Sequence, residues 1–236
     1  MATTPAAQKC ADKMVAHKVN QSAISAFLAN HKAVEAGETG AIAEADIEPT
    51  TDLPYLNNVE VTENAELLKQ TVILKLNGGL GTGMGLSKAK SLLEVKKGET
   101  FLDFIAKQVI HMREEFKVPL KFMLMDSFST SEDTKKFFEK YPEFSKEFST
   151  EVEFLQNKVP KIRQDDFTPA DYPEDPETEF CPPGHGDLYS ALLGSGKLDQ
   201  LIKDGYKYAF VSNSDNLGAT MDLRILSYLE DKGLEF

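Results

Sequence analysis

The sequence lacks the features typical of secreted proteins, of membrane proteins and of proteins stabilised by a bound metal. Its two cysteines, Cys10 and Cys181, stand far apart and outside any CxxC or CxxH spacing, which argues against a zinc site and against a disulfide framework. It has no run of about 18 apolar residues that could cross a membrane. Its first residues form neither a signal peptide nor an arginine-rich transit peptide, since the first arginine is Arg113. We therefore expect a protein of a reducing, cytoplasmic compartment and no membrane partner.

Basic residues are also scarce. The chain has 26 Lys and Arg against 38 Asp and Glu, a formal net charge of −12, and its lysines form no stripe. A polymeric nucleic acid is therefore not expected as a partner, whereas a local positive site could still bind a mononucleotide. With 236 residues, of which 41% are hydrophobic, the chain is long enough for one large domain with a small appendage.

The apolar pattern divides the chain into two parts. Residues 6–34 carry apolar side chains at helical spacing, which predicts two short helices. Residues 35–54 are acidic and lose this periodicity, as in a connector. We expect a helical N-terminal segment with its connector at residues 1–51 and the main domain at residues 52–236.

From residue 71 onward, apolar runs typical of strands alternate with amphipathic runs typical of helices. Strands are expected at residues 71–76, 119–125, 152–155 and 206–211, and helices at residues 102–116, 132–141, 188–193 and 198–203. Thr100 and Asp103 suit the start of the first of these helices. The alternation predicts an α/β fold, in which ligands bind outside the carboxyl ends of the strands.

A glycine-rich loop directly follows the first predicted strand. Residues 78–85 hold five glycines in eight positions, and such a loop can aim several backbone N–H groups at bound phosphates. The spacing fits neither GxGxxG nor GxxxxGK[ST]. Lys88 and Lys90 follow and could add a cation beside the phosphates. The alternatives are a flexible glycine linker and solvated lysines near a helix start.

Polar residues also follow the later predicted strands. Asp215 could hold Mg²⁺ against nucleotide phosphates, although an Asx-turn explains an aspartate there equally well. His185 lies between two glycines, where the backbone can approach a ligand closely, and a plain turn histidine is its alternative. Gln156 could read a nucleobase edge or be an ordinary loop amide. Residues 156–186 are proline-rich and too long for a simple connection, so we expect them to serve function.

Five segments of the sequence, taken in order, resemble the UTP–glucose-1-phosphate uridylyltransferases, also called UDP-glucose pyrophosphorylases. They are residues 76–85 (LNGGLGTGMG), 88–92 (KAKSL), 154–157 (FLQN), 182–187 (PPGHGD) and 213–216 (NSDN). The resemblance runs from about residue 52 to the last residue. It implies a Rossmann-like, GT-A-like nucleotidyltransferase fold with a mixed sheet flanked by helices. Because the family continues into further sugar-site elements and a C-terminal β-helix domain, we expect the catalytic domain to be incomplete here.

The resemblance also implies a reaction. The phosphate of glucose 1-phosphate would attack the α-phosphorus of UTP, giving UDP-glucose and pyrophosphate, with Mg²⁺ as the cofactor and no covalent enzyme intermediate (EC 2.7.7.9). The alternatives are a UTP-binding fragment without catalysis and a pyrophosphorylase for another sugar 1-phosphate. The oligomeric state is left open.

Site residues follow from the resemblance, position by position. Those implied to bind the nucleotide are Leu76, Asn77, Gly78, Gly79, Lys90, Gln156, Gly184 and Asp215. Those implied to bind the sugar phosphate are Gly78, Gly79, His185, Asn213, Ser214 and Asp215. Lys90 and Asp215 would be the catalytic pair, with Lys90 neutralising the phosphates and Asp215 holding Mg²⁺.

Overall fold

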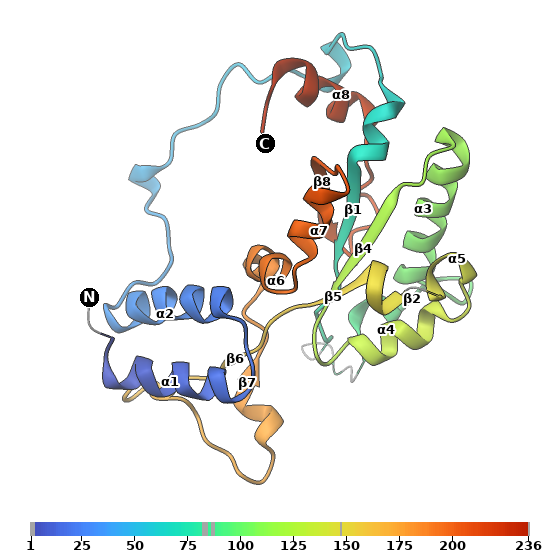
Figure 1. Ribbon diagram of the computed structural model, residues 1–236. Helices are drawn as coiled ribbons and strands as arrows, with labels where there is room; N and C mark the ends of the chain where they lie inside the picture. Colours follow the sequence, from blue (N-terminus) through green and yellow to red (C-terminus); the bar gives the residue numbers. More distant parts are fainter. Residues whose placement is uncertain (1–2, 82–84, 86–87, 147, 236) are drawn as a thin grey trace.

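A four-stranded parallel sheet forms the centre of the computed structural model, which describes residues 3–81, 85, 88–146 and 148–235 (Figure 1). Its strands, in spatial order, are β5 (Glu153–Leu155), β4 (Lys121–Asp126), β1 (Thr71–Leu76) and β8 (Tyr208–Asn213). The two central strands are buried along almost their whole length. Such continuous burial is typical of a parallel sheet covered on both faces.

The family resemblance implies a mixed sheet, whereas every pairing of the described central strands is parallel. Among the described residues, antiparallel pairing occurs outside this sheet, in two isolated bridges and in two short ribbons. One joins β2 (Glu94–Lys96) to β3 (Glu99–Thr100), and the other joins β6 (Val159–Pro160) to β7 (Phe180–Cys181). The predicted α/β alternation is confirmed. The antiparallel pairing lies outside the described central sheet.

Helices cover both faces of the sheet. The helices of the main part are α3 (Phe101–Phe116), α4 (Ser131–Phe138), α5 (Pro142–Ser145), α6 (Leu188–Gly194), α7 (Lys197–Lys203) and α8 (Leu223–Lys232). Ile73 of β1 faces a core that includes α3 and α8, whereas Leu74 faces a core that includes α6 and α7. The helix α3 starts with the predicted cap, because Thr100 and Asp103 accept each other's backbone N–H bonds.

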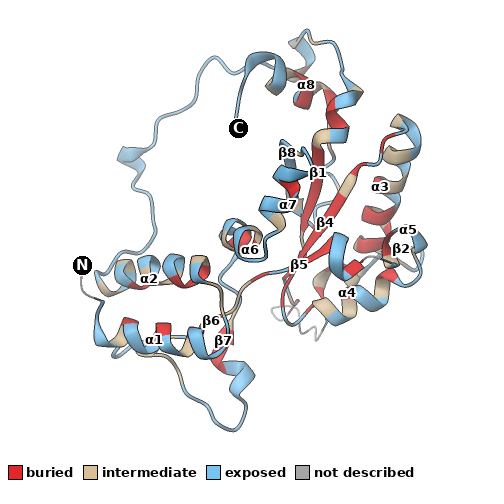
Figure 2. Cartoon of the chain, in the orientation of Figure 1, coloured by how far each residue is buried: buried red, intermediate tan, exposed pale blue. Residues whose placement is uncertain are grey.

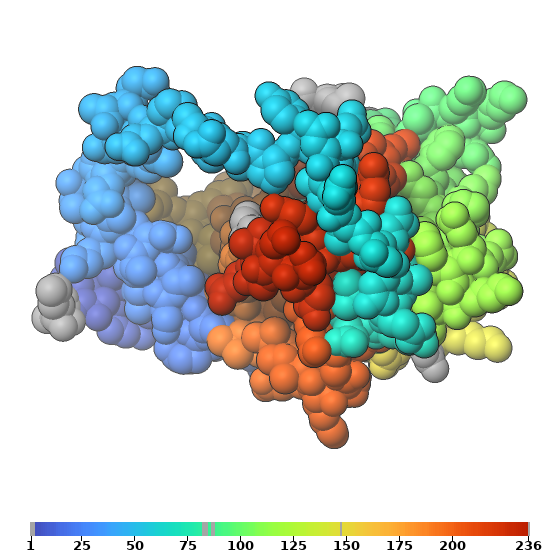
Figure 3. Space-filling model, turned by 90° about the horizontal axis from the view of Figure 1, so that it is seen from above, coloured from blue at the N-terminus to red at the C-terminus, as the bar shows by residue number. Residues whose placement is uncertain are grey.

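The predicted N-terminal helices are confirmed as α1 (Pro5–Ala16) and α2 (Gln21–Glu35). They pack on each other, α1 contacts β6, and α2 contacts α6. Residues 36–64 then run to the sheet as an extended, mostly exposed connector with short 3₁₀ turns (Figure 2). The space-filling view shows this connector crossing from the helix pair to the main part (Figure 3). No helix among the described residues is long and apolar enough to cross a membrane.

Candidate nucleotide site

The carboxyl ends of the central strands bring the predicted site segments to one edge of the sheet. Hydrogen bonding continues one residue beyond three of the strands, where Asn77 N–H donates to Met125 O (2.8 Å) and Ser214 N–H donates to Leu76 O (3.1 Å). Gln156 N–H donates in the same way to Asp126 O (2.7 Å). The segments that follow β1 and β8, more than 130 residues apart in the sequence, therefore begin at adjacent positions that these hydrogen bonds fix.

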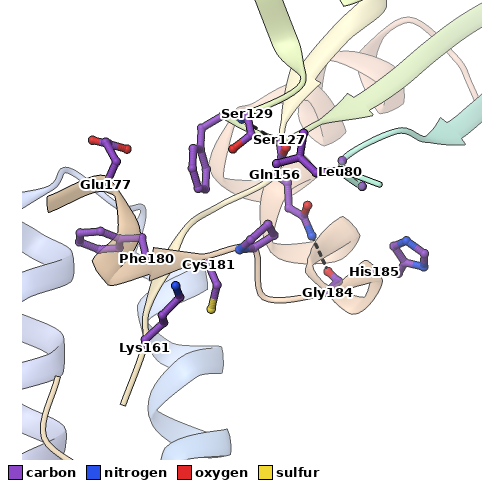
Figure 4. Close-up of a pocket in the computed structure, with 14 residues that line it drawn as sticks. Leu80, Ser127, Ser129, Gln156, Lys161, Glu177, Phe180, Cys181, Gly184 and His185 are labelled. Atoms are coloured by element: carbon purple, nitrogen blue, oxygen red, sulfur yellow. Dashed lines mark hydrogen bonds between the residues drawn. The ribbon is translucent and has the colours of Figure 1, made fainter. Parts of the chain in front are cut away.

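A cavity of about 510 Å³ lies at this edge. Its walls come from the residues after β1, from the turn between β4 and α4, and from the segment before α6 (Figure 4). Of the residues predicted to bind substrates, Gly78, Gly79, Gln156, Gly184 and His185 line it. A cavity of this size can hold a nucleotide-sized ligand.

Gln156 joins two walls of the cavity. Its side-chain Nε2 donates to the carbonyl of Gly184 at 2.7 Å, the contact drawn as a dashed line in Figure 4. A Cβ atom at Gly78 would lie 2.5 Å from Gln156 Oε1, so only glycine allows this approach. Gly184 has φ 100°, a conformation that favours glycine. Gln156 is 6% exposed, and both its orientation and its neighbours are fixed.

Lys90 and Asp215, the predicted catalytic pair, contact each other. The chain returns after the glycine loop through a bridge between Leu80 and Ala89, and Lys90 N–H donates to Gly79 O at 3.0 Å. Lys90 Nζ then lies 2.6 Å from Asp215 Oδ2, with both side chains partly exposed. The pair is thus a charged group at the accessible side of the glycine loop.

The alternative in which the two lysines stand near the start of a helix does not fit, because Lys90 begins only a short 3₁₀ turn. Residues 90–92 form a single 3₁₀ turn, the β2–β3 ribbon follows, and α3 begins only at Phe101. The hairpin has strands of two and three residues, too short to give a periodic pattern. Of the glycine loop, Thr82, Gly83 and Met84 lie outside the described residues.

In the turn after β8, Asn216 and Asp215 make different kinds of contact. Asn216 Oδ1 accepts a bond from Ala219 N–H at 3.2 Å, which closes the turn. Asp215 instead directs its carboxylate to Lys90. Asn213 is exposed at the end of β8 and Ser214 is buried beside it. The Asx-type alternative therefore applies to Asn216, whereas the Asp215 carboxylate contacts Lys90, and neither partner of this pair is among the residues that line the cavity.

The Asn77 side chain points beneath the site instead of into it. Its Nδ2 donates to Asp126 Oδ1 (2.6 Å) and to Thr134 Oγ1 (3.0 Å), and Thr130 also donates to Asp126. Burial raises the pKa of Asp126 to about 8, against the opposing effect of these hydrogen bonds. The family resemblance implies that Asn77 binds the nucleotide, and the sequence pattern assigns no role to Asp126. The polar run that follows β4 was the available signal.

Comparison with known proteins identifies the family. The family model described as UTP–glucose-1-phosphate uridylyltransferase matches residues 18–236. The chain belongs to this family. Uridylyltransferases from Solanum tuberosum and Saccharomyces cerevisiae are each 41% identical to it, over 82% and 74% of this chain. These matches cover 42% and 34% of the two relatives, so the chain spans less than half of their length.

Solved uridylyltransferase structures share the fold. The UDP-glucose pyrophosphorylase of Leishmania major, as a point mutant in complex with UDP-glucose, is 52% identical with a TM-score of 0.94. That match covers 98% of this chain and 48% of the other. A Trypanosoma brucei protein is 53% identical with a TM-score of 0.92, over 98% and 49%. The predicted family and fold class are confirmed, and the individual site residues remain predictions that the geometry above supports.

Proposed function

We propose that this chain carries the UTP site of an enzyme that converts UTP and glucose 1-phosphate to UDP-glucose and pyrophosphate. The observation that carries the proposal is the placement of two contacts around Gly78 and Gly79. The fixed amide of Gln156 lies against Gly78, and the Lys90–Asp215 pair lies at the end of the loop that Gly79 begins. The Leishmania relative, whose complex contains UDP-glucose, supports a uridine nucleotide as the ligand.

Gln156 suits recognition of uracil. Its Nε2 is held by Gly184 O, and its Oε1 faces the glycine loop. An acceptor oriented in this way matches the N3–H donor of uracil, which cytosine lacks. A site built to bond one such group rejects analogues without it by a large factor, because a buried polar group is left unpaired. We therefore expect UTP to bind more tightly than CTP or ATP.

Lys90 and Asp215 suit the phosphate end. A lysine beside the transferred phosphate stabilises negative charge that develops during attack, which is the main contribution of proteins to this class of reaction. Asp215 offers one partly exposed carboxylate, and Mg²⁺ is usually bound by one or two carboxylates together with substrate phosphates. Asp215 would thus hold Mg²⁺, which when bound supplies positive charge against the triphosphate. His185 and Asn213, both exposed, would face the sugar phosphate.

A calorimetric titration with UTP and Mg²⁺, with CTP and ATP as controls, tests the binding part on this 236-residue chain. UTP-selective binding supports the proposal, and equal affinity for all three nucleotides contradicts the role of Gln156. Pyrophosphate release after addition of glucose 1-phosphate then separates an active transferase from a UTP-binding fragment. A panel of sugar 1-phosphates distinguishes the glucose enzyme from a pyrophosphorylase for another sugar.

The charged pair is tested by substitution in a polypeptide of the full family length. Lys90→Ala and Asp215→Ala are each expected to abolish turnover without loss of the fold, and Lys96→Ala, an exposed lysine on β2, is the matched control. Near wild-type rates in either site variant would refute the assignment. The proposed compartment is the cytosol, since Cys10 and Cys181 are both free thiols, which is usual in reducing compartments.

A further inference from the structure

The junction of the two N-terminal helices contacts the wall of the nucleotide cavity through one side chain. Asn20 caps α2, because its Oδ1 accepts from Ala23 N–H at 2.9 Å. Its Nδ2 donates to Asn157 Oδ1 at 2.5 Å, across 137 residues of chain. Asn20 therefore uses one end of its amide to start a helix and the other end to hold a loop.

Asn157 also contacts Asp187, on the other side of the cavity. It follows Gln156 directly, its backbone N–H donates to Asp187 Oδ2 at 2.6 Å, and its Nδ2 donates to Asp187 Oδ1 at 2.9 Å. Asp187 is 8% exposed and ends the turn that begins with Gly184 and His185. The distance between Gln156 and this turn is therefore fixed by two parallel contacts, Gln156 to Gly184 and Asn157 to Asp187.

Other contacts hold the helix pair in the same place. Ser22 Oγ donates to Ser190 O at 3.0 Å, and the Asn20 side chain packs so closely on Gly194 of α6 that a Cβ there would have no room. Further along the 157–187 segment, Lys13 Nζ donates to Ala170 O at 2.6 Å and His31 Nε2 lies 2.9 Å from Phe167 O. The helix pair thus contacts the segment at its start, through Asn157, and in its middle, through Phe167 and Ala170.

We infer that Asn20 is a positioning residue for the uridine pocket, and that the N-terminal helix pair acts through Asn20, Asn157 and Asp187 to set the pocket's width. The uridine part of this inference rests on the proposed function. Asn20 touches no substrate in this scheme. It orients Asn157, which in turn places Gln156 and the Gly184–His185 turn at the separation that a base requires.

The variant Asn20→Asp tests the inference because it keeps the helix cap, removes the donor and adds one negative charge, for which a control is available. Aspartate caps helices as well as asparagine does, but its carboxylate would face Asn157 Oδ1. Asn157 cannot turn its amide to compensate, since its Nδ2 already lies 2.9 and 3.0 Å from the two oxygens of Asp187. The matched control is Gln21→Glu, which adds the same charge at the neighbouring exposed position.

Hydrogen exchange of the unliganded chain is the first measurement. We expect the amides of residue 157 and residues 184–188 to exchange about tenfold faster in Asn20→Asp than in the wild type or in Gln21→Glu, with β1 unchanged. UTP affinity should fall about tenfold, the effect of one or two lost hydrogen bonds. Unchanged exchange around the cavity, or equal acceleration throughout β1, would overturn the inference.

A double variant gives the sharpest check. In Asn20→Asp combined with Asp187→Asn, the Asn157 amide can turn by about 180°, so that it donates to residue 20 and accepts from residue 187. Protection and UTP affinity should then return towards wild-type values, and failure of this rescue would count against the relay. If the wild-type chain does not bind UTP, the proposed function fails, while the exchange measurements still decide the role of Asn20.

Discussion

Gly78→Ala should destabilise the protein because of one contact. The new Cβ would lie 2.5 Å from Gln156 Oε1 and 3.4 Å from Ser127 Cβ. Gln156 can relieve the clash only by rotating away, which breaks its bond to Gly184 O and costs about 0.5–1.5 kcal/mol. Residual overpacking adds about 1 kcal/mol, and the lower entropy of the unfolded chain returns about 0.4–1 kcal/mol. We expect a net loss of about 1 kcal/mol in the free energy of unfolding.

Gly79→Ala is the matched control, because a Cβ at Gly79 would meet nothing within 4 Å. This variant should be unchanged or stabilised by up to about 1 kcal/mol, so urea unfolding should separate the two alanine variants by about 1–2 kcal/mol. In Gly78→Ala combined with Gln156→Ala, the second substitution should cost less than it does alone. Equal unfolding midpoints for the two single variants would refute the reasoning.

Three further predictions concern the fold. Burial raises the pKa of Asp126 to about 8, so between about pH 4 and 8 the folded chain keeps a proton on this carboxyl that the unfolded chain releases. Asp126 should therefore make the wild-type free energy of unfolding fall as pH rises through this range, by up to about 1.4 kcal/mol per pH unit. This slope should be reduced in Asp126→Asn, and an unchanged slope in urea titrations at several pH values would contradict the assignment. Phe138→Ala removes a fully buried ring that contacts four other phenylalanine rings, so we expect a loss of about 3–5 kcal/mol in the free energy of unfolding, measured by denaturant titration. Thr100→Ala removes the α3 cap and should cost about 1 kcal/mol, whereas Thr100→Ser should keep most of it; equal midpoints for the two would count against the cap.

The predictable parts of the fold were those with local signals. The apolar runs of β1 and β4, the helix α3 with its Thr100 cap, and the convergence of polar segments at the strand ends all follow from patterns within a few residues. The strand β8 is shifted two residues towards the C-terminus, since Tyr206 N–H closes α7 by donating to Leu201 O. An apolar residue can serve a strand or a helix end, and the pattern alone does not distinguish them.

The unpredicted parts depend on direction or on distant contacts. A polar residue at a strand end can face the ligand or the layer beneath, and only the packed α4 helix shows that Asn77 faces Asp126 and Thr134. The relay from Asn20 to Asn157 joins two loops that share no local pattern. Two asparagines in two turns are ordinary turn residues until the fold brings them together.

The exposed connector of residues 36–64 contributes little to how firmly the helix pair α1–α2 is held. With so few buried side chains, this stretch behaves as a tether that only keeps the helix pair at a high local concentration near its binding surface. Doubling the length of such a tether changes its closure cost by only about 0.6 kcal/mol, whereas several contacts hold the helix pair to the main part, among them the ion pair between Lys13 and Glu179. Lengthening this stretch should therefore leave the helix pair seated, because the helices hold their place through their own contacts.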